Sequence, residues 1–268
     1  MRTIAVTSGK GGVGKTNLSA NLGLALASLQ KRVVIFDADL GLANLDIVLG
    51  TRAAFNLQNV VSGEKRLLDV VATGPGGVRY IAGGSGVETL VNLSGPQLES
   101  FLMGLEELQS STDYLIFDTG AGVDAHVMMF LEAADETLLV ATPDPASLTD
   151  AYATAKVLYG RKPDAVVRLV VNMAEDDAQA SALYVKLQSI VKQFLGKSLQ
   201  YAGAIRHDPK AIQYIRQRKP FLLADRGLQA SRGVLTIASV IAGQAIEQEQ
   251  GGIVNRLRSV FGLERRTA

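Results

Sequence analysis

The chain of 268 residues has no cysteine, only two histidines and no apolar run of membrane-spanning length. Without cysteine, the protein cannot form disulfides, zinc sites with thiolate ligands or cysteine-held iron–sulfur clusters, and a reducing cytosol suits it. His126 and His207 have no partner at metal-ligand spacing, and they are too few for a Ser-His-Asp nucleophile. The longest apolar stretches, such as LTIASVIAG from Leu235, fall short of the ~18 residues that a spanning helix needs.

The chain also has little net charge. Its 27 basic and 26 acidic side chains give a formal charge of +1, which excludes a protein that wraps nucleic acid over its whole surface. A local basic patch is still open, as is a solvated helix end, for the segment 214–219. Hydrophobic residues make up 47% of the chain, and the N-terminus has no secretory apolar region. We expect a soluble protein with one large domain.

Short apolar runs that do not alternate with polar residues recur along the chain, separated by helix-like stretches such as 17–30 and 97–109. Strands buried on both faces have this pattern, so we predict an α/β fold with a doubly wound, mostly parallel sheet. The predicted strands are 3–8, 32–39, 78–83, 113–120, 136–143 and 166–173. The predicted divisions are a P-loop domain over 1–247, a flexible linker over 248–252 and an amphipathic helix over 253–266.

Residues 9–16, GKGGVGKT, satisfy G-x-x-x-x-G-K-[ST] between a predicted strand and a predicted helix, as a phosphate-binding loop requires. The glycines let backbone N–H groups point at phosphate oxygens, and the helix N-terminus favours an anion. Lys15 is expected to reach the β- and γ-phosphates of a nucleotide, and the Thr16 hydroxyl to ligate Mg²⁺. The other nucleotide contacts predicted around this loop are Gly11, Gly12, Val13, Gly14 and Asn17.

Aspartates follow two of the predicted strands. Asp118 comes after an apolar run, as a Walker B carboxylate that holds Mg²⁺ does. Asp37 and Asp39 stand at the end of another strand, where ligands bind in open α/β sheets. Such residues also serve as turn or helix caps. Beside a phosphate loop we assign Asp118 to the metal and Asp39 to the attacking water, and leave Asp37 open to either role.

The loop holds a second lysine, Lys10, which phosphate binding does not require. The arrangement K-G-G-V-G-K-T resembles the deviant Walker A motif of the MinD/ParA (SIMIBI) family of ATPases. The resemblance implies that Lys10 crosses a dimer interface and contacts the phosphates of the partner, as an arginine finger does. It thus implies an ATP-bound homodimer and a Mg²⁺-dependent ATPase, slow without its partner, with Lys10, Lys15 and Asp39 catalytic. The alternative is a solvated loop lysine.

Three segments, 37–50, 117–122 and 142–156, resemble most closely the FlhG (FleN) branch of that family, which regulates flagellar number. This resemblance implies a regulator of flagellar placement and number whose partners are flagellar switch (C-ring) proteins and a flagellar transcription activator. The chain begins at its first strand, without the N-terminal segment that activates an FlhF-type GTPase, so stimulation of that partner is not expected.

The same family reads adenine with an asparagine at the end of a late strand, which corresponds to Asn172 here. Pro143 and Asp144 are assigned to the same adenine pocket. An amide side chain suits this role because it both donates to and accepts from the adenine edge. The alternative for Asn172 is a turn cap.

The last segment, 251–266, is basic and amphipathic. Five apolar residues gather on one side of a helix: Ile253, Val254, Leu257, Val260 and Phe261. Such a helix can lie on an anionic membrane, and it resembles the membrane-targeting tail of MinD and FlhG. That implies a cytoplasmic protein that is peripheral at the inner face of the cell membrane when ATP is bound. The alternative is a terminal helix packed on the core.

Three other functions are kept beside the flagellar one. They are a MinD-like regulator of the cell-division site, a ParA-like DNA partition ATPase and a P-loop metabolic amide synthetase. A partition ATPase would retain DNA in a salt-sensitive, ATP-dependent manner. A synthetase would need a substrate pocket beside the phosphates.

Overall fold

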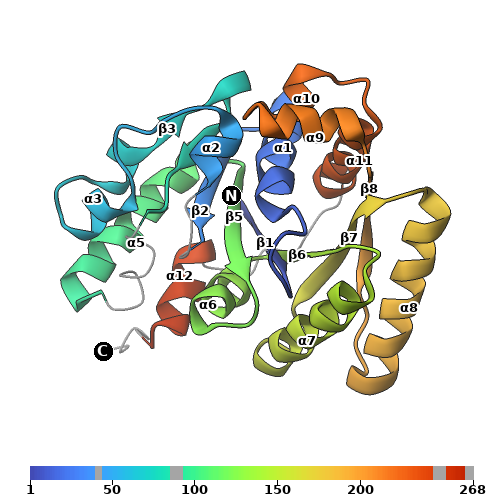
Figure 1. The fold of residues 1–268 in the computed structure, drawn as a ribbon. Helices are drawn as coiled ribbons and strands as arrows, with labels where there is room; N and C mark the ends of the chain where they lie inside the picture. Colours follow the sequence, from blue (N-terminus) through green and yellow to red (C-terminus); the bar gives the residue numbers. More distant parts are fainter. Residues whose placement is uncertain (40–43, 85–92, 244–251, 263–268) are drawn as a thin grey trace.

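The computed structural model describes residues 1–39, 44–84, 93–243 and 252–262. In these ranges the strands form one eight-stranded sheet in the order β3-β4-β2-β5-β1-β6-β7-β8, parallel except for the pair β3–β4 (Figure 1). The strands are β1 Arg2–Ser8, β2 Val33–Ala38, β3 Ala72–Thr73, β4 Arg79–Ile81, β5 Tyr114–Ala121, β6 Glu136–Ala141, β7 Val166–Ala174 and β8 Gln200–Arg206.

Helices cover both faces of the sheet (Figure 1). One face carries α1 Lys15–Ser28, α2 Leu45–Leu49, α9 Pro209–Arg216, α10 Phe221–Ala224 and α11 Gln229–Gly243. The other face carries α3 Leu57–Val61, α5 Gly95–Ser110, α6 Ala125–Ala133, α7 Pro145–Arg161, α8 Asp177–Leu195 and α12 Gly252–Val260. Two short 3-10 helices, η1 Leu67–Val70 and η2 Pro75–Gly77, precede and follow β3 in the chain. The prediction of a doubly wound α/β fold is confirmed.

The core explains why the strand sequences do not alternate. Along β5, Tyr114 and Ile116 pack in the layer beneath α1 and α11, while Leu115 and Phe117 pack in the layer beneath α5 and α6. Both faces of the strand are therefore buried, and each large apolar side chain contributes about 1.5–3 kcal/mol by leaving water. All six predicted strands are present. The structure adds the two-residue β3 and the edge strand β8.

A buried ion cluster ties together three central strands. The Glu136 carboxylate on β6 lies 2.6 Å from the guanidinium groups of both Arg2 on β1 and Arg168 on β7. Arg2 also donates to the Ile241 carbonyl of α11 at 2.5 Å. Removing one partner of such a cluster leaves an uncompensated buried charge, so these contacts fix the neighbours of β1, the strand that leads to the phosphate loop.

The C-terminal helix α12 is docked on the domain. Ile253, Val254 and Leu257 are at most 2% exposed and pack in the core layer of α5 and α6. Of the other apolar residues predicted for the membrane face, Val260 is 36% exposed and Phe261 is partly buried. In the described part of the tail, the structure therefore has the arrangement of the alternative, a terminal helix packed on the core.

Ion pairs hold the polar edges of α12. The Arg256 guanidinium lies 2.9 Å from Asp135 and donates to the Ala133 carbonyl at 2.6 Å. Arg258 donates to both carboxylate oxygens of Glu99 on α5, at 2.5 and 2.7 Å. Apart from Gly252, the predicted linker 248–252 lies outside the described residues, as does the end of the predicted helix beyond residue 262. Membrane targeting by this segment stays a prediction.

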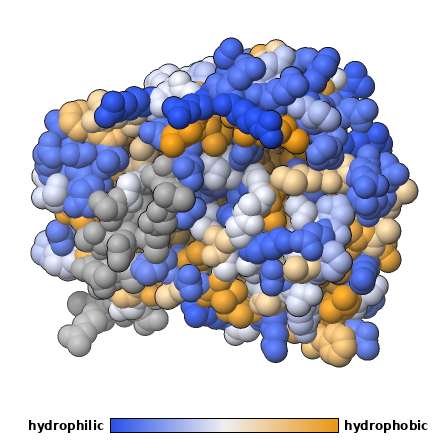
Figure 2. Space-filling view, viewed as in Figure 1, coloured by the Kyte–Doolittle hydropathy of each residue, from blue (hydrophilic) through white to orange (hydrophobic). Residues whose placement is uncertain are grey.

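Across the ranges that the structure describes, no helix combines the length and apolar character needed to cross a bilayer. On the face seen in Figure 2, hydrophobic residues form small patches between hydrophilic ones. Single exposed apolar residues of this kind are ordinary on a protein surface.

Candidate nucleotide-binding site

The phosphate loop joins β1 to α1 at the middle of the sheet. β1 has β5 on one side and β6 on the other, and the strand order reverses there. Open α/β sheets bind ligands at this switch point, beyond the carboxyl ends of the strands. Gly14 stands just before α1 with φ +91°, a left-handed conformation that glycine adopts at little cost. The free N–H groups of the first helical turn are thus available to an anion.

Two glycines are required because other elements approach the loop closely. A methyl group added at Gly9 would stand 2.3 Å from the Asp150 carbonyl carbon of α7. One added at Gly14 would stand 2.4 Å from Nδ2 of Asn172, at the end of β7. The loop is therefore held between α7 and β7, and its shape depends on both.

Lys15 lies deep in the site. Its side chain is largely buried, and its ammonium group donates to the Ser8 hydroxyl at 3.0 Å. Burial lowers the pKa of Lys15, while the negative charges of Asp118 and Asp39 act in the opposite direction. A cation held among carboxylates at the loop is suited to the phosphates of a nucleotide, as predicted from the sequence.

Thr16 and Asp118, the two predicted magnesium ligands, lie together. The buried Asp118 carboxylate accepts hydrogen bonds from the Ser19 hydroxyl at 2.8 Å and from the Thr16 hydroxyl. Burial raises the pKa of Asp118 to about 6, although both hydroxyls and Lys15 oppose the rise. Ser19, one turn after Thr16 on the same face of α1, was missed, although its i, i+3 spacing was a usable signal.

These donors fit Mg²⁺. Within the described ranges, no group of three or more His, Cys, Asp or Glu side chains is arranged to hold a metal ion. Magnesium in nucleotide sites does not need such a group, since it takes one or two protein oxygens and completes its shell with phosphates and water. The Thr16 hydroxyl and the Asp118 carboxylate supply oxygens of this kind.

Asp37 and Asp39 have different surroundings. Asp37 is buried, is the register partner of Asp118, and accepts from the backbone N–H groups of Asp39 and Leu45 at 3.3 Å each. Burial, and then the charge of Asp118, raise the pKa of Asp37 to about 8. Asp39 is only partly buried, and its Oδ1 would lie 3.3 Å from a methyl group at Gly120. Asp37 therefore holds the backbone at the end of β2 and at the start of α2, and Asp39 faces the end of β5.

An Asp37→Asn variant is expected to stabilise the ligand-free protein at alkaline pH. Because the folded pKa of about 8 lies above the unfolded value of 3.8, this carboxyl's contribution to stability is complete below the unfolded value and is lost as the pH rises through 8. The amide removes that loss, so the gain in unfolding free energy grows from near zero at about pH 4 to about 1–3 kcal/mol at about pH 8. Thermal unfolding without Mg²⁺ measures it. The exposed Asp164→Asn is the control, and an equal gain at every pH would contradict the assignment.

Lys10 is held by a residue of its own chain. Its ammonium group forms an ion pair with the Asp144 carboxylate, and about a third of the Lys10 side chain is exposed. Asp144 also caps α7 by accepting from the Ala146 N–H at 3.0 Å, and the Lys10 contact holds the pKa of Asp144 below its usual value. Lys10 therefore rests at the rim of the loop, beside the N-terminus of α7.

A small hollow of about 80 Å³ lies where an adenine pocket was predicted, between the start of α1, the end of β7 and α9. Asn17 and Asn172 line it, whereas Pro143 and Asp144 do not. Asn172 donates to the Val13 carbonyl at 2.7 Å and accepts from the Met173 N–H at 2.9 Å, so its amide also fastens the phosphate loop. The other residues around the hollow, which include several that sequence reasoning missed, are Gly14, Leu18, Met173, Ile205, Arg206, His207, Asp208, Ala211, Ile212, Ile215, Phe221 and Ala230.

The late loop before α9 is ordered by Asp208. Its carboxylate caps α9 by accepting from Lys210 and Ala211, and it also accepts from the N–H of Gln229 on α11 at 3.2 Å. The apolar i, i+1, i+4 spacing of Ala211, Ile212 and Ile215 was the signal for the wall of the hollow.

The basic segment 214–219 lies at the end of α9 and in the loop that follows. Arg218 and Lys219 border a surface hollow of about 730 Å³ together with Arg52, but Asp46 lines it too. The positive charge at this place is local and mixed with a carboxylate.

Comparison with known proteins identifies relatives of this chain in sequence and in structure. Residues 1–242 match the ParA family, described as "NUBPL iron-transfer P-loop NTPase". The antiactivator FleN of Pseudomonas aeruginosa is 39% identical over 90% of this chain and 86% of its own length. The flagellum site-determining protein YlxH of Helicobacter pylori is 39% identical over 81% of this chain and 73% of its own length. The MinC:MinD cell division complex of Aquifex aeolicus contains a chain with a TM-score of 0.75 and 26% identity, covering 94% of this chain and all of that one.

Proposed function

Because this chain belongs to the ParA family of P-loop ATPases, on the branch of FleN and YlxH, we propose that it is an ATP-controlled regulator of flagellar placement and number. The observation that carries the proposal is the second loop lysine, Lys10, which forms an ion pair with the exposed Asp144 carboxylate of its own chain. The names of the two flagellar relatives, an antiactivator and a site-determining protein, supply the biological class.

The residues of the loop divide the work of hydrolysis. Lys15 and the loop N–H groups bind the phosphates, and Thr16 and Asp118 would hold Mg²⁺, which would supply further positive charge to the phosphates. Asp39 orients the attacking water and accepts its proton. Lys10 supplies positive charge to the phosphates of a second copy, so that neither site is complete in a single chain.

The contact between Lys10 and Asp144 is the switch within each chain. An exposed ion pair of this kind contributes little to stability, so it yields readily to the greater charge of a nucleoside triphosphate. We infer that ATP brings two chains together because Lys10 exchanges Asp144 for the partner's phosphates. After hydrolysis and loss of phosphate, the cis pair is restored and the dimer separates.

The same cycle would govern residence at the membrane. Ile253, Val254 and Leu257 are buried against the domain, so α12 has to leave its place before its apolar side can enter a bilayer. One short helix binds a membrane weakly, whereas two tails in a dimer raise avidity by about 10²–10⁴-fold. We infer a cytoplasmic monomer and a dimer at the inner face of the membrane, where flagellar switch components and a flagellar transcription activator are the partners by resemblance.

A Glu99→Arg variant is expected to bind anionic vesicles without ATP. The change repels Arg258 and loosens α12 without altering its apolar side, which corresponds to about 1 kcal/mol, or roughly fivefold more bound protein. Co-sedimentation with vesicles in ADP measures it. The control is Glu107→Arg, an exposed position on the same helix, α5. If Glu99→Arg and the wild type bind equally, α12 is not the membrane element.

The proposed function itself is tested in two steps. Solution mass and vesicle co-sedimentation in ADP or ATP with Mg²⁺ should show dimers and membrane binding with ATP alone. Expression in Pseudomonas aeruginosa lacking FleN should then restore the flagellar number of the parent strain. Dimers without membrane binding would favour the DNA partition reading, and no dimer would remove the role of Lys10.

Iron transfer through a thiolate-held cluster is not supported, since the chain has no cysteine.

A further inference from the structure

The edge strand β8 borders an open groove on the side that faces away from β1, the strand that leads to the phosphate loop. Among the described residues, β8 pairs only with β7, so one of its edges is unpaired. The pairing of β8 with β7 shifts register between Tyr201 and Gly203 and again at Arg206, so the regular part of the free edge is Gly203 to Ile205. Unpaired N–H and C=O groups on such an edge are a template for another strand. Natural proteins commonly cover or blunt an edge of this length, here 7 residues.

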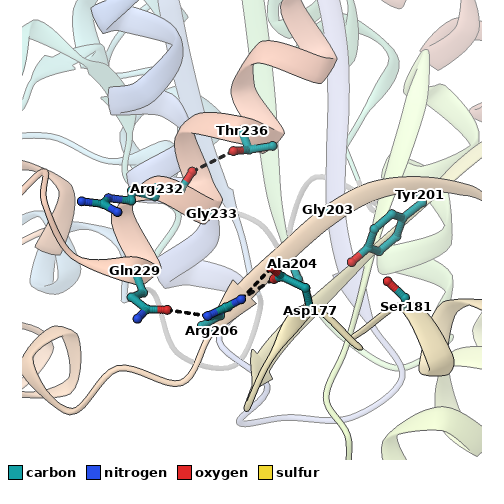
Figure 3. Close-up of a pocket in the computed structure, with 10 residues that line it drawn as sticks. All are labelled: Asp177, Ser181, Tyr201, Gly203, Ala204, Arg206, Gln229, Arg232, Gly233 and Thr236. Atoms are coloured by element: carbon teal, nitrogen blue, oxygen red, sulfur yellow. Dashed lines mark hydrogen bonds and ion pairs between the residues drawn. The ribbon is translucent and has the colours of Figure 1, made fainter. Parts of the chain in front are cut away.

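The groove has a volume of about 540 Å³, within the range of about 300–1,000 Å³ typical of ligand sites. Its floor is β8, one wall is the start of α8, and the other wall is α11 (Figure 3). It is lined by Asp177, Ser181, Tyr201, Gly203, Ala204, Arg206, Gln229, Arg232, Gly233 and Thr236.

Small side chains keep the groove open. Gly233 of α11 packs so closely on β8 that a methyl group there would stand 2.4 Å from the Ala204 carbonyl oxygen. Because α11 sits directly on the strand at this point, its neighbours at the rim determine the width, and these are Thr236 on α11 and Ser181 on α8. Both are exposed, and neither is large enough to cover the strand edge.

The charges of the groove favour an acidic ligand. The charge of Arg206 is already paired within the protein. Its guanidinium donates to both Asp177 oxygens, at 3.2 and 2.6 Å, and to Gln229 at 2.9 Å (Figure 3). Arg232 is exposed and extends from α11 away from that pair (Figure 3), and in the described part of the chain its guanidinium has no ion-pair partner. The charge that the groove offers to a ligand is therefore the positive charge of Arg232.

We propose that this groove binds an extended peptide of a partner protein, which adds to β8 as a further strand and places an acidic side chain at Arg232. Backbone hydrogen bonds to the strand edge supply affinity, and the walls and Arg232 supply selectivity, as in other cases of strand addition. An extended peptide fits better than a compact ligand because the groove follows β8, where Gly203 and Ala204 leave room beside the strand. The groove lies outside the phosphate loop and shares one lining residue, Arg206, with the hollow where adenine was predicted, so a bound peptide would leave the phosphate loop itself open.

The test uses the full chain and a displayed library of random peptides as long as β8, 7 residues. Selected peptides are expected to be rich in Asp and Glu. Their affinity, measured by fluorescence anisotropy, should fall at least about tenfold with Ser181→Trp, which fills the groove, and with Arg232→Glu. Ser189→Trp, at an exposed serine of the same helix that does not line the groove, should leave it unchanged. Unchanged thermal unfolding of each variant shows that the fold is intact.

Backbone pairing is tested separately. Methylating alternate peptide nitrogens should abolish binding in one of the two alternations and spare the other, because only every second N–H of an added strand faces β8. Amide exchange in β8 should slow when the peptide binds. The proposal is overturned if no acidic peptide is selected, if Ser181→Trp binds as the wild type does, or if both alternations bind equally. Nucleotide-free dimers that Ser181→Trp abolishes would also overturn it, because the occupant would then be a second copy.

Discussion

A Lys10→Ala variant is expected to bind ATP as the wild type does, but to lose ATP-dependent dimers and at least about 10³-fold in hydrolysis rate. The lysine at rest contacts Asp144, which does not line the hollow where adenine was predicted, so nucleotide affinity in a single chain should not depend on it. A charge supplied to a phosphoryl transition state by a second molecule has an effect of this size.

The comparison variant is Asp144→Asn. Asparagine caps a helix as well as aspartate does, so α7 keeps its start, while the charge that holds Lys10 is removed. This variant should dimerise at a lower ATP concentration than the wild type. Analytical ultracentrifugation with a nucleotide titration, together with phosphate release, measures both effects. If Lys10→Ala dimerises at the wild-type ATP concentration, the trans role of Lys10 is refuted.

An Asp39→Asn variant is expected to keep both nucleotide binding and dimers but to lose about 10²–10⁴-fold in hydrolysis. Asp39 is the carboxylate after β2 that is left partly exposed and faces the end of β5 at Gly120. An amide there can still hold a water molecule, but it cannot accept its proton. The variant should therefore accumulate as the ATP-bound dimer.

Asp37→Asn provides the contrast two residues earlier. With a pKa of about 8, Asp37 is mostly protonated at neutral pH, and it accepts a hydrogen bond from Leu45 at the start of α2, so the amide should retain most of the hydrolysis rate. Single-turnover hydrolysis in preassembled dimers separates the chemical step from dimerisation. The reverse order, with Asp37→Asn slow and Asp39→Asn active, would exchange the roles of the two aspartates.

The parts of the fold that the sequence predicts are those with a strong local pattern. Central strands such as 113–120 are apolar on both faces, and their neighbours in the sheet do not change that pattern. β8, with the sequence QYAGAIR, was missed because its small residues carry little apolar signal. It forms because α11 covers one of its faces, with Ala202 and Ile205 buried in the same core layer as Val234 and Ile237. That is a tertiary contact, which a single segment does not contain.

The candidate site divides in the same way. The loop from Gly9 to Thr16 is a contiguous motif, so its residues were assigned from the sequence. The partners of Lys10 and Val13 lie 134 and 159 positions away in the chain, and no spacing rule reaches that far. The tail shows another limit, because an apolar helix side has the same pattern whether it meets a protein core or a lipid bilayer. In the structure, the apolar side of α12 meets the protein core, whereas the sequence pattern alone is compatible with either a core or a bilayer.

The seating of α12 also restricts how this tail can change over evolutionary time. Ile253, Val254 and Leu257 fill the protein interior at rest, and in the proposed cycle the same atoms enter lipid. A larger side chain that favoured the bilayer would overfill the interior, and a smaller one that eased release would weaken both resting stability and anchoring. Selection therefore acts at these positions against both larger and smaller side chains. We would expect homologous tails to conserve the volume of these three side chains more strictly than that of the exposed residues of the same helix, Asn255 and Ser259.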